Sequence, residues 1–145
     1  MATDFSAASN RAVETAVSLA RQCDAALTLL HVVDISAQTV AGRTMPAAEL
    51  MKSLWERAFE DMSRLAYSLR GQVNAQTAME EGLPCEVIIE KSRSFDILII
   101  GQTRQKSRWN LFSHHTVQRV LQNAACPVIV ATEKQAAPIR VYQPA

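Results

Sequence analysis

The sequence predicts an α/β domain with a doubly wound parallel sheet and helices on both of its faces. Two apolar runs rich in strand-forming residues, at 26–33 and 96–100, have the composition of strands that are buried on both sides. Segments with the spacing of amphipathic helices lie between and around these runs, so helix and strand alternate along the chain. Parallel neighbours need long crossover connections, and this alternation supplies them.

Two helices are predicted in the first half of the chain. Alanines and valines recur at three- and four-residue steps over 7–23, which is the spacing of one buried helix face. Pro46 suits the first position of a second helix, with Thr44 as its cap. That helix carries one apolar face over 51–69 and is expected to stop at Gly71.

The second half of the chain continues the alternation. An edge strand is predicted at 73–79, followed by a short helix that opens at residues 82–84. A last helix spans 114–123 with Ser113 as its N-cap, and a final strand spans 126–131. In such a sheet, ligands bind beyond the carboxyl ends of the strands, at the point where strand order reverses.

Length and composition exclude several classes of protein. A chain of 145 residues with 48% hydrophobic and 20% charged residues is expected to fold as one globular domain. The net charge of +1 gives no general attraction to nucleic acids or anionic membranes. No segment has the length of a membrane span, and the first residues lack the pattern of a secretion signal. Three widely spaced cysteines fit reduced thiols, so a cytoplasmic location is expected, with no nucleic-acid or membrane partner.

Four segments, taken together, resemble the universal stress protein family. They are Ala2–Ser6, Leu27–Asp34, Asp96–Gly101, and the stretch that joins Arg119–Leu121 to Cys126–Val130. The resemblance runs over about residues 2–132 in the family's order and spacing. We therefore expect a universal stress protein domain at 1–132 and a C-terminal tail at 133–145 that is strand-like at 139–142.

The resemblance also implies an arrangement and a role. It implies a five-stranded sheet of order 3-2-1-4-5 and a stress-linked cytoplasmic protein. It further implies a homodimer formed through the last strand, at Val128–Ala131.

Some members of that family bind ATP through a loop that holds three glycines and then a hydroxyl residue. Here Gly101 is the first glycine, whereas Arg104 and His114 stand at the second and third positions and His115 at the hydroxyl position. Glycines let backbone N–H groups curl closely around phosphate, and side chains obstruct that approach. ATP binding is therefore expected to be weak or absent. The alternative is that the cations of this loop, with Ser113 at a helix N-terminus, hold the phosphate instead.

The base side of the family's nucleotide site is retained in this sequence. Asp4 corresponds to the family's acid on the adenine side, and Val33 to a residue that lines the base. Asp4 is also a candidate N-cap of the first helix, and the two roles are compatible. His31 lies inside an apolar strand and is interpreted as a core histidine with a hydrogen-bond partner rather than a ligand.

Three functions from different classes follow from these observations. The first is a dimeric regulatory or protective stress module with weak or absent ATP binding. The second is an adenine-nucleotide sensor that uses the basic loop, with ATP or AMP as its ligand. The third is slow ATP hydrolysis, but the sequence has no nucleophile elbow and no metal-ligand spacing, so no catalytic or metal-binding residue is assigned.

The predicted first strand is unusually short for a central strand. About three residues are available for it before the chain turns at Asp4, which would leave backbone groups of its neighbours unpaired. One hypothesis is that residues 139–142 supply the missing pairing, within the chain or by exchange in a dimer. The other is that the recorded start lacks residues of the strand.

Overall fold

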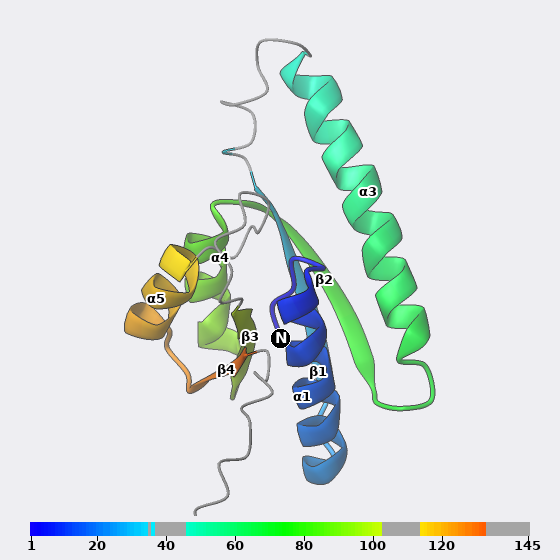
Figure 1. Cartoon of the computed structure of the whole chain (residues 1–145), viewed down its shortest axis with the longest axis vertical. Coiled ribbons are helices and arrows are strands. Elements are labelled where there is room, and N and C mark those ends of the chain that lie inside the picture. Colours follow the sequence, from blue (N-terminus) through cyan, green and yellow to red (C-terminus); the bar gives the residue numbers. More distant parts are fainter. Residues whose placement is uncertain (35, 37–45, 103–113, 133–145) are drawn as a thin grey trace, which may run out of the picture.

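The computed structural model describes residues 1–34, 36, 46–102 and 114–132. Its elements follow in the order α1 (Ala7–Cys23), β1 (Leu27–Asp34), α3 (Ala47–Ser68), β2 (Ala75–Gly82), α4 (Pro84–Lys91), the 3-10 turn η1 (Ser92–Ser94), β3 (Leu98–Gln102), α5 (His114–Asn123) and β4 (Val128–Thr132). β1 pairs with β2, and β3 pairs with β4, both in parallel (Figure 1). The predicted α/β class with parallel strands is confirmed.

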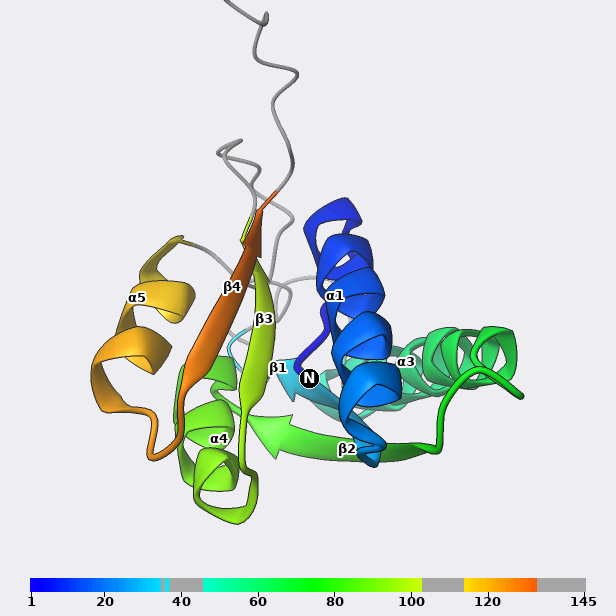
Figure 2. The same cartoon turned by 90° about the horizontal axis from the view of Figure 1, so that it is seen from below.

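The helices form two layers with the strands between them. Figure 2 shows α1 and α3 on one side of the strands and α4 and α5 on the other. Each layer has its own apolar cluster against the strands. Met62 and Leu29 belong to the cluster under α1 and α3, and Ile88 and Val117 to the cluster under α4 and α5. Helices therefore cover both faces, as predicted.

Ala2 connects the two pairs of strands. It forms parallel bridges to Leu30 of β1 and to Ile100 of β3. Its N–H donates to the carbonyl of Ile99 at 2.9 Å, and the N–H of Thr3 donates to the carbonyl of Leu30 at 2.8 Å. Within the described residues, the predicted first strand is thus reduced to one bridging residue, and its backbone is paired on both sides.

The N-cap of α1 is Ser6, so the assignment of Asp4 as the cap was wrong. Ser6 Oγ accepts a hydrogen bond from the N–H of Ser9 at 3.3 Å. Serine and aspartate are comparable caps, and only the residue at which helical geometry begins decides between them. At the other end, Asp24 adopts the left-handed conformation with φ 50°, which closes the helix.

α3 begins one residue later than predicted. Pro46 stands in the cap position without a side-chain cap bond, and the helix starts at the next residue. It ends at Ser68, with Gly71 at φ 75° in the turn that follows. Only Ala58 and Met62 of this helix are buried, so its apolar face is mostly half-covered. Among the helices described, none is long and apolar enough to cross a membrane.

The strands lie one to three residues further along the chain than predicted. Apolar composition marks the buried segment, whereas pairing with a neighbour decides where the strand begins and ends. The helices at α4 and α5 are confirmed at their predicted places. Thr44, Arg104, Ser113 and the tail at 133–145, including 139–142, lie outside the described residues.

Gly101 lies where β3 passes the first turn of α1. A Cβ added at this glycine would come within 2.3 Å of the carbonyl oxygen of Ala8 and 2.8 Å of the nitrogen of Ser9. Both are backbone atoms and cannot move aside without shifting the helix. Gly101 therefore has a packing role that is independent of any ligand.

Gly101→Ala is expected to lower the free energy of unfolding by about 2 kcal/mol or more, because the new methyl group overlaps the α1 backbone. Gly71→Ala is the control, since a Cβ there meets no atom within 4 Å and strains only the positive φ. We expect that change to cost about 1 kcal/mol. Urea denaturation measures both. A Gly101→Ala protein as stable as the wild type would contradict the close contact with α1.

Candidate functional site

A cavity of about 230 Å³ lies between the start of α1, the end of β1 and the middle of α3. It contains the two residues predicted to line a nucleotide base, Asp4 and Val33. The described residues that line it are Asp4, Phe5, His31, Val33, Asp34, Leu54, Arg57, Ala58 and Asp61. The structure thus brings the base-side residues together at the carboxyl end of β1, where a ligand is expected in a parallel α/β fold.

The turn at residues 3–6 is held by a dense set of hydrogen bonds. Asp4 Oδ1 accepts from the N–H of Ser6 at 3.0 Å and from Ser9 Oγ at 2.5 Å, and the N–H of Asp4 donates to Ser9 Oγ at 3.1 Å. The N–H of Phe5 donates to Thr3 Oγ1 at 3.0 Å. These bonds fix the Asp4 carboxylate before any ligand arrives, which lowers the entropic cost of binding.

Phe5 is held in a strained conformation at the edge of the cavity. Its φ is 59°, in the left-handed region that a bulky residue rarely adopts. Its ring stacks on the ring of His31, with centroids 4.6 Å apart and an interplanar angle of 30°. Strain of this kind persists only where surrounding bonds enforce it, and it is concentrated at functional sites.

His31 is a buried histidine with a partner, as predicted. It is 5% exposed, and its Nδ1 lies 2.9 Å from the carbonyl oxygen of Thr3. Burial lowers the pKa of His31 below its usual value, and the bond to Thr3 and the charges of Asp4 and Asp61 only partly oppose this. The ring is therefore neutral at pH 7.

Among the residues that the structure describes, the charges that line the cavity are mainly negative. Asp4, Asp34 and Asp61 line it, and Arg57 is the cation among these described lining residues. Asp61 lies 3.3 Å from Arg64, which is on the same helix. A phosphate group would be repelled by these carboxylates, whereas an uncharged group rich in N–H or O–H donors would find acceptors. The cavity therefore suits the base or nucleoside part of a nucleotide better than its phosphates.

Two residues predicted for the phosphate side, Gly101 and His115, do not line this cavity. Gly101 is packed against α1 and does not line it. His114 begins α5, and His115 is exposed on the same helix. Arg104 and Ser113 are outside the described residues. The base side of the predicted site is thus assembled, while the phosphate side remains a prediction.

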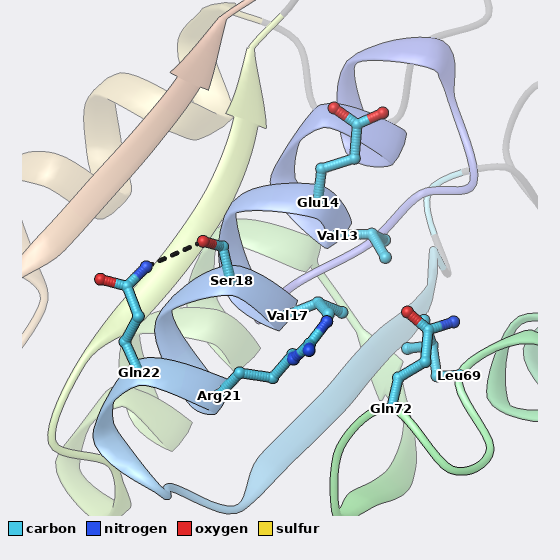
Figure 3. A pocket seen from close by; sticks show the side chains of 8 residues that line it. All are labelled: Val13, Glu14, Val17, Ser18, Arg21, Gln22, Leu69 and Gln72. Atoms are coloured by element: carbon cyan, nitrogen blue, oxygen red, sulfur yellow. Dashed lines mark hydrogen bonds between the residues drawn. The ribbon is translucent and has the colours of Figure 1, made fainter.

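A second hollow lies elsewhere on α1. It has a volume of about 660 Å³ and faces the turn after α3. In Figure 3 its wall from α1 carries Glu14, Ser18, Arg21 and Gln22, with Gln22 Nε2 donating to Ser18 Oγ at 2.9 Å. Asp4, Val33, Gly101 and His115 do not line it. Within the ranges that the structure describes, no cluster of three or more potential metal ligands is present.

Sequence reasoning missed the wall that α3 contributes. Leu54, Ala58 and Asp61 recur at steps of four and three residues, so they share one face of the helix. That spacing was visible in the sequence, but it did not show which cavity the face would line. His31 was placed in the core, yet it alternates with Val33 on one face of β1, and this signal could have marked it as a lining residue.

Comparison with known proteins agrees with this fold. Residues 1–132 match the family model described as the universal stress protein family. A universal stress protein of Methanocaldococcus jannaschii is 29% identical over 133 residues, which is 88% of this chain and 77% of that protein.

Solved structures of universal stress proteins have a similar fold. The universal stress protein UspA from Lactobacillus plantarum has a TM-score of 0.68 and 25% identity, over 90% of this chain and 93% of that one. A universal stress protein family protein from Arabidopsis thaliana, solved with AMP bound, has a TM-score of 0.60 and 17% identity. It covers 86% of this chain and 78% of that chain. The chain belongs to the universal stress protein family.

Proposed function

We propose that this protein is a regulatory or protective stress module that holds an adenine nucleotide weakly, through its base rather than its phosphates. The observation that carries the proposal is the cavity in which Asp4 and Val33 meet. It is supported by the relative from Arabidopsis thaliana that was solved with AMP bound. The carboxylates among the described lining residues favour the uncharged base, rather than the phosphates, as the part of the nucleotide that is buried.

The departures at Arg104, His114 and His115 support weak binding of the phosphates. Three positions that carry glycine or a hydroxyl in ATP-binding members carry larger cationic or aromatic side chains here, which limits close backbone approach. The alternative, a nucleotide sensor whose basic loop replaces the glycines, predicts instead that each added phosphate strengthens binding. The two proposals are separated by comparing adenosine, AMP and ATP.

We also propose the sheet order implied by the resemblance, with the segment at Ala2 as its central strand. The order would then be β2, β1, Ala2, β3 and β4. The parallel bridges from Ala2 to Leu30 and Ile100 support it. With that order, the cavity at the end of β1 lies close to the point where strand order reverses.

A homodimer through β4 is part of the proposal. Within the described residues, β4 pairs only with β3, so its other edge has no strand beside it. Val128, Ile129 and Val130 of this edge strand are only half-buried. An apolar edge strand of this kind is a template for pairing with a second copy of the chain.

We propose that the module acts without catalysis and in the cytoplasm. The part of the chain that the structure describes assembles no metal-ligand cluster beside the cavity, and Asp4 is committed to structural hydrogen bonds. The three cysteines are free, with Cys23 exposed and the other two half-buried. Free thiols fit a reducing compartment.

Leu54→Trp is expected to weaken AMP binding at least tenfold, because the larger ring fills the cavity between α3 and β1. Leu65→Trp is the matched control, since Leu65 is also a half-buried leucine of α3 but does not line the cavity. Calorimetric titration at pH 7.5 measures both affinities, after any co-purified nucleotide has been removed. Adenosine and ATP, titrated in parallel, separate base-led from phosphate-led binding.

The Leu65→Trp control separates filling of the cavity from general damage to α3. Equal weakening in both variants would show that damage to α3, rather than filling of the cavity, is responsible. A wild-type protein that is folded but binds neither adenosine, AMP nor ATP would reject nucleotide binding altogether.

Val130→Lys is expected to convert the proposed dimer to a monomer, because a charge on the half-buried edge strand opposes pairing with a second copy. Phe59→Lys is the control, since Phe59 is 65% exposed on α3, which packs on β1 and β2 rather than on β4. Sedimentation equilibrium measures the mass, and circular dichroism verifies folding. A folded wild-type monomer at micromolar concentration would contradict the dimer.

A further inference from the structure

The second ring nitrogen of His31 is available to a ligand. Nδ1 of this histidine is engaged by the carbonyl of Thr3, and Nε2 has no hydrogen-bond partner among the described residues. Every fully buried side-chain nitrogen or oxygen in the described part of the chain does have a partner. Nε2 is therefore not fully buried, although His31 as a whole is 5% exposed. His31 lines the cavity, so Nε2 is the ring nitrogen that remains for a ligand there.

The bond to Thr3 also fixes which nitrogen carries the proton. A carbonyl oxygen only accepts hydrogen bonds, so Nδ1 must donate, and in the neutral ring this leaves Nε2 with a lone pair. The stacked ring of Phe5 holds the imidazole in that orientation. Nε2 is thus a pre-positioned acceptor in the wall of the cavity, and any ligand group beside it must bring an N–H or O–H.

We propose that His31 is a specificity-determining residue of this site, whose Nε2 accepts a hydrogen bond from the exocyclic amino group of a purine. The inference rests on the proposed nucleotide-binding function and deepens it. It explains how a cavity bounded by carboxylates and a neutral imidazole would select a donor-bearing base. A purine without the amino group would leave this nitrogen unpaired, and an unpaired buried polar atom is costly.

The same geometry makes binding depend on pH. Among the described residues, the charged groups that line the cavity with His31 are Asp4 before α1, Asp34 at the end of β1, and Asp61 and Arg57 on α3. Burial keeps the pKa of His31 below its usual value of 6.5, so the neutral acceptor form prevails at pH 7. As the pH falls below that pKa, Nε2 gains a proton and becomes a donor that opposes the amino group. Affinity is therefore present at neutral pH and lost in acid.

The test compares adenosine with purine riboside, which lacks only the amino group, by calorimetric titration of the full chain at pH 7.5. We expect the wild type to bind adenosine about tenfold more tightly, in keeping with one buried hydrogen bond. His31→Asn keeps a donor near the position of Nδ1 for the carbonyl of Thr3 but removes Nε2. In that variant the preference for adenosine is expected to disappear.

The pH profile gives a second readout that needs no variant. The affinity of the wild type for adenosine is expected to fall severalfold as the pH drops through the lowered pKa of His31, and that of His31→Asn is expected to stay level. A merely structural histidine would not change the ratio between the two ligands.

The outcomes separate the two levels of the proposal. If the wild type binds adenosine and purine riboside equally, or if His31→Asn retains the preference, the role of His31 is overturned while nucleotide binding stands. An equal loss of both ligands in His31→Asn also overturns it, because the lost contact is then not to the amino group. If the folded wild type binds neither ligand nor AMP, the proposed function fails and this inference fails with it.

Discussion

The structure depends on residues 1–3, which are inserted between β1 and β3. Ala2 is fully buried and forms parallel bridges to both strands, so it joins two strand pairs that otherwise share no ladder in the described chain. The bonds from Ala2 to Ile99 and from Thr3 to Leu30 satisfy backbone groups that would be costly to bury unpaired. Because Ala2 is fully buried, a larger side chain at position 2 would have to displace its neighbours.

The same segment shapes the cavity that is proposed to hold the base. Immediately after Ala2, the carbonyl of Thr3 holds His31, and the carboxylate of Asp4 is fixed by Ser6 and Ser9. Ser9 belongs to the first turn of α1, which packs closely on Gly101 of β3. The end of β3 therefore supports the turn that presents Asp4, although Gly101 does not itself line the cavity. The contacts that pack α1 on β3 thus also support the turn beside the cavity. A change at Gly101 is therefore expected to shift the residues that line this cavity.

Periodicity and composition predicted the helices and the class of the fold, because these follow from patterns within one segment, whereas the base-side residues came from the resemblance to the family. The helix at 7–23 is confirmed, and Asp4 and Val33 line one cavity, while their contact with a base stays a prediction. The cap of α1 was misassigned because Asp4 and Ser6 are both good cap residues, and only the geometry of the turn separates them. The role of α3 could not be predicted, because it depends on how that helix lies over β1. The reason for glycine at 101 was likewise hidden, since it arises from a contact with α1, which is distant in sequence.

His31 shows how a correct prediction can be incomplete. The strand pattern placed it in the core with a partner, and this is confirmed by its burial and by its bond to Thr3. A histidine has two ring nitrogens, however, and only the structure reveals that His31, with one nitrogen bound to Thr3, also lines a cavity. The strain at Phe5, whose ring stacks on His31, was equally invisible in the sequence, because it arises from the hydrogen bonds of the turn.

The most direct measurement of the central claim, that this cavity holds a purine base, is a nuclear magnetic resonance titration of the isotopically labelled protein with AMP. If AMP binds in this cavity, we expect chemical-shift changes to be concentrated at Phe5, His31, Val33 and Ala58. The Nε2 resonance of His31 is expected to move as this nitrogen accepts a hydrogen bond. Shifts confined to the hollow of Figure 3, around Val17 and Leu69, or no shifts at all at millimolar AMP, would contradict it.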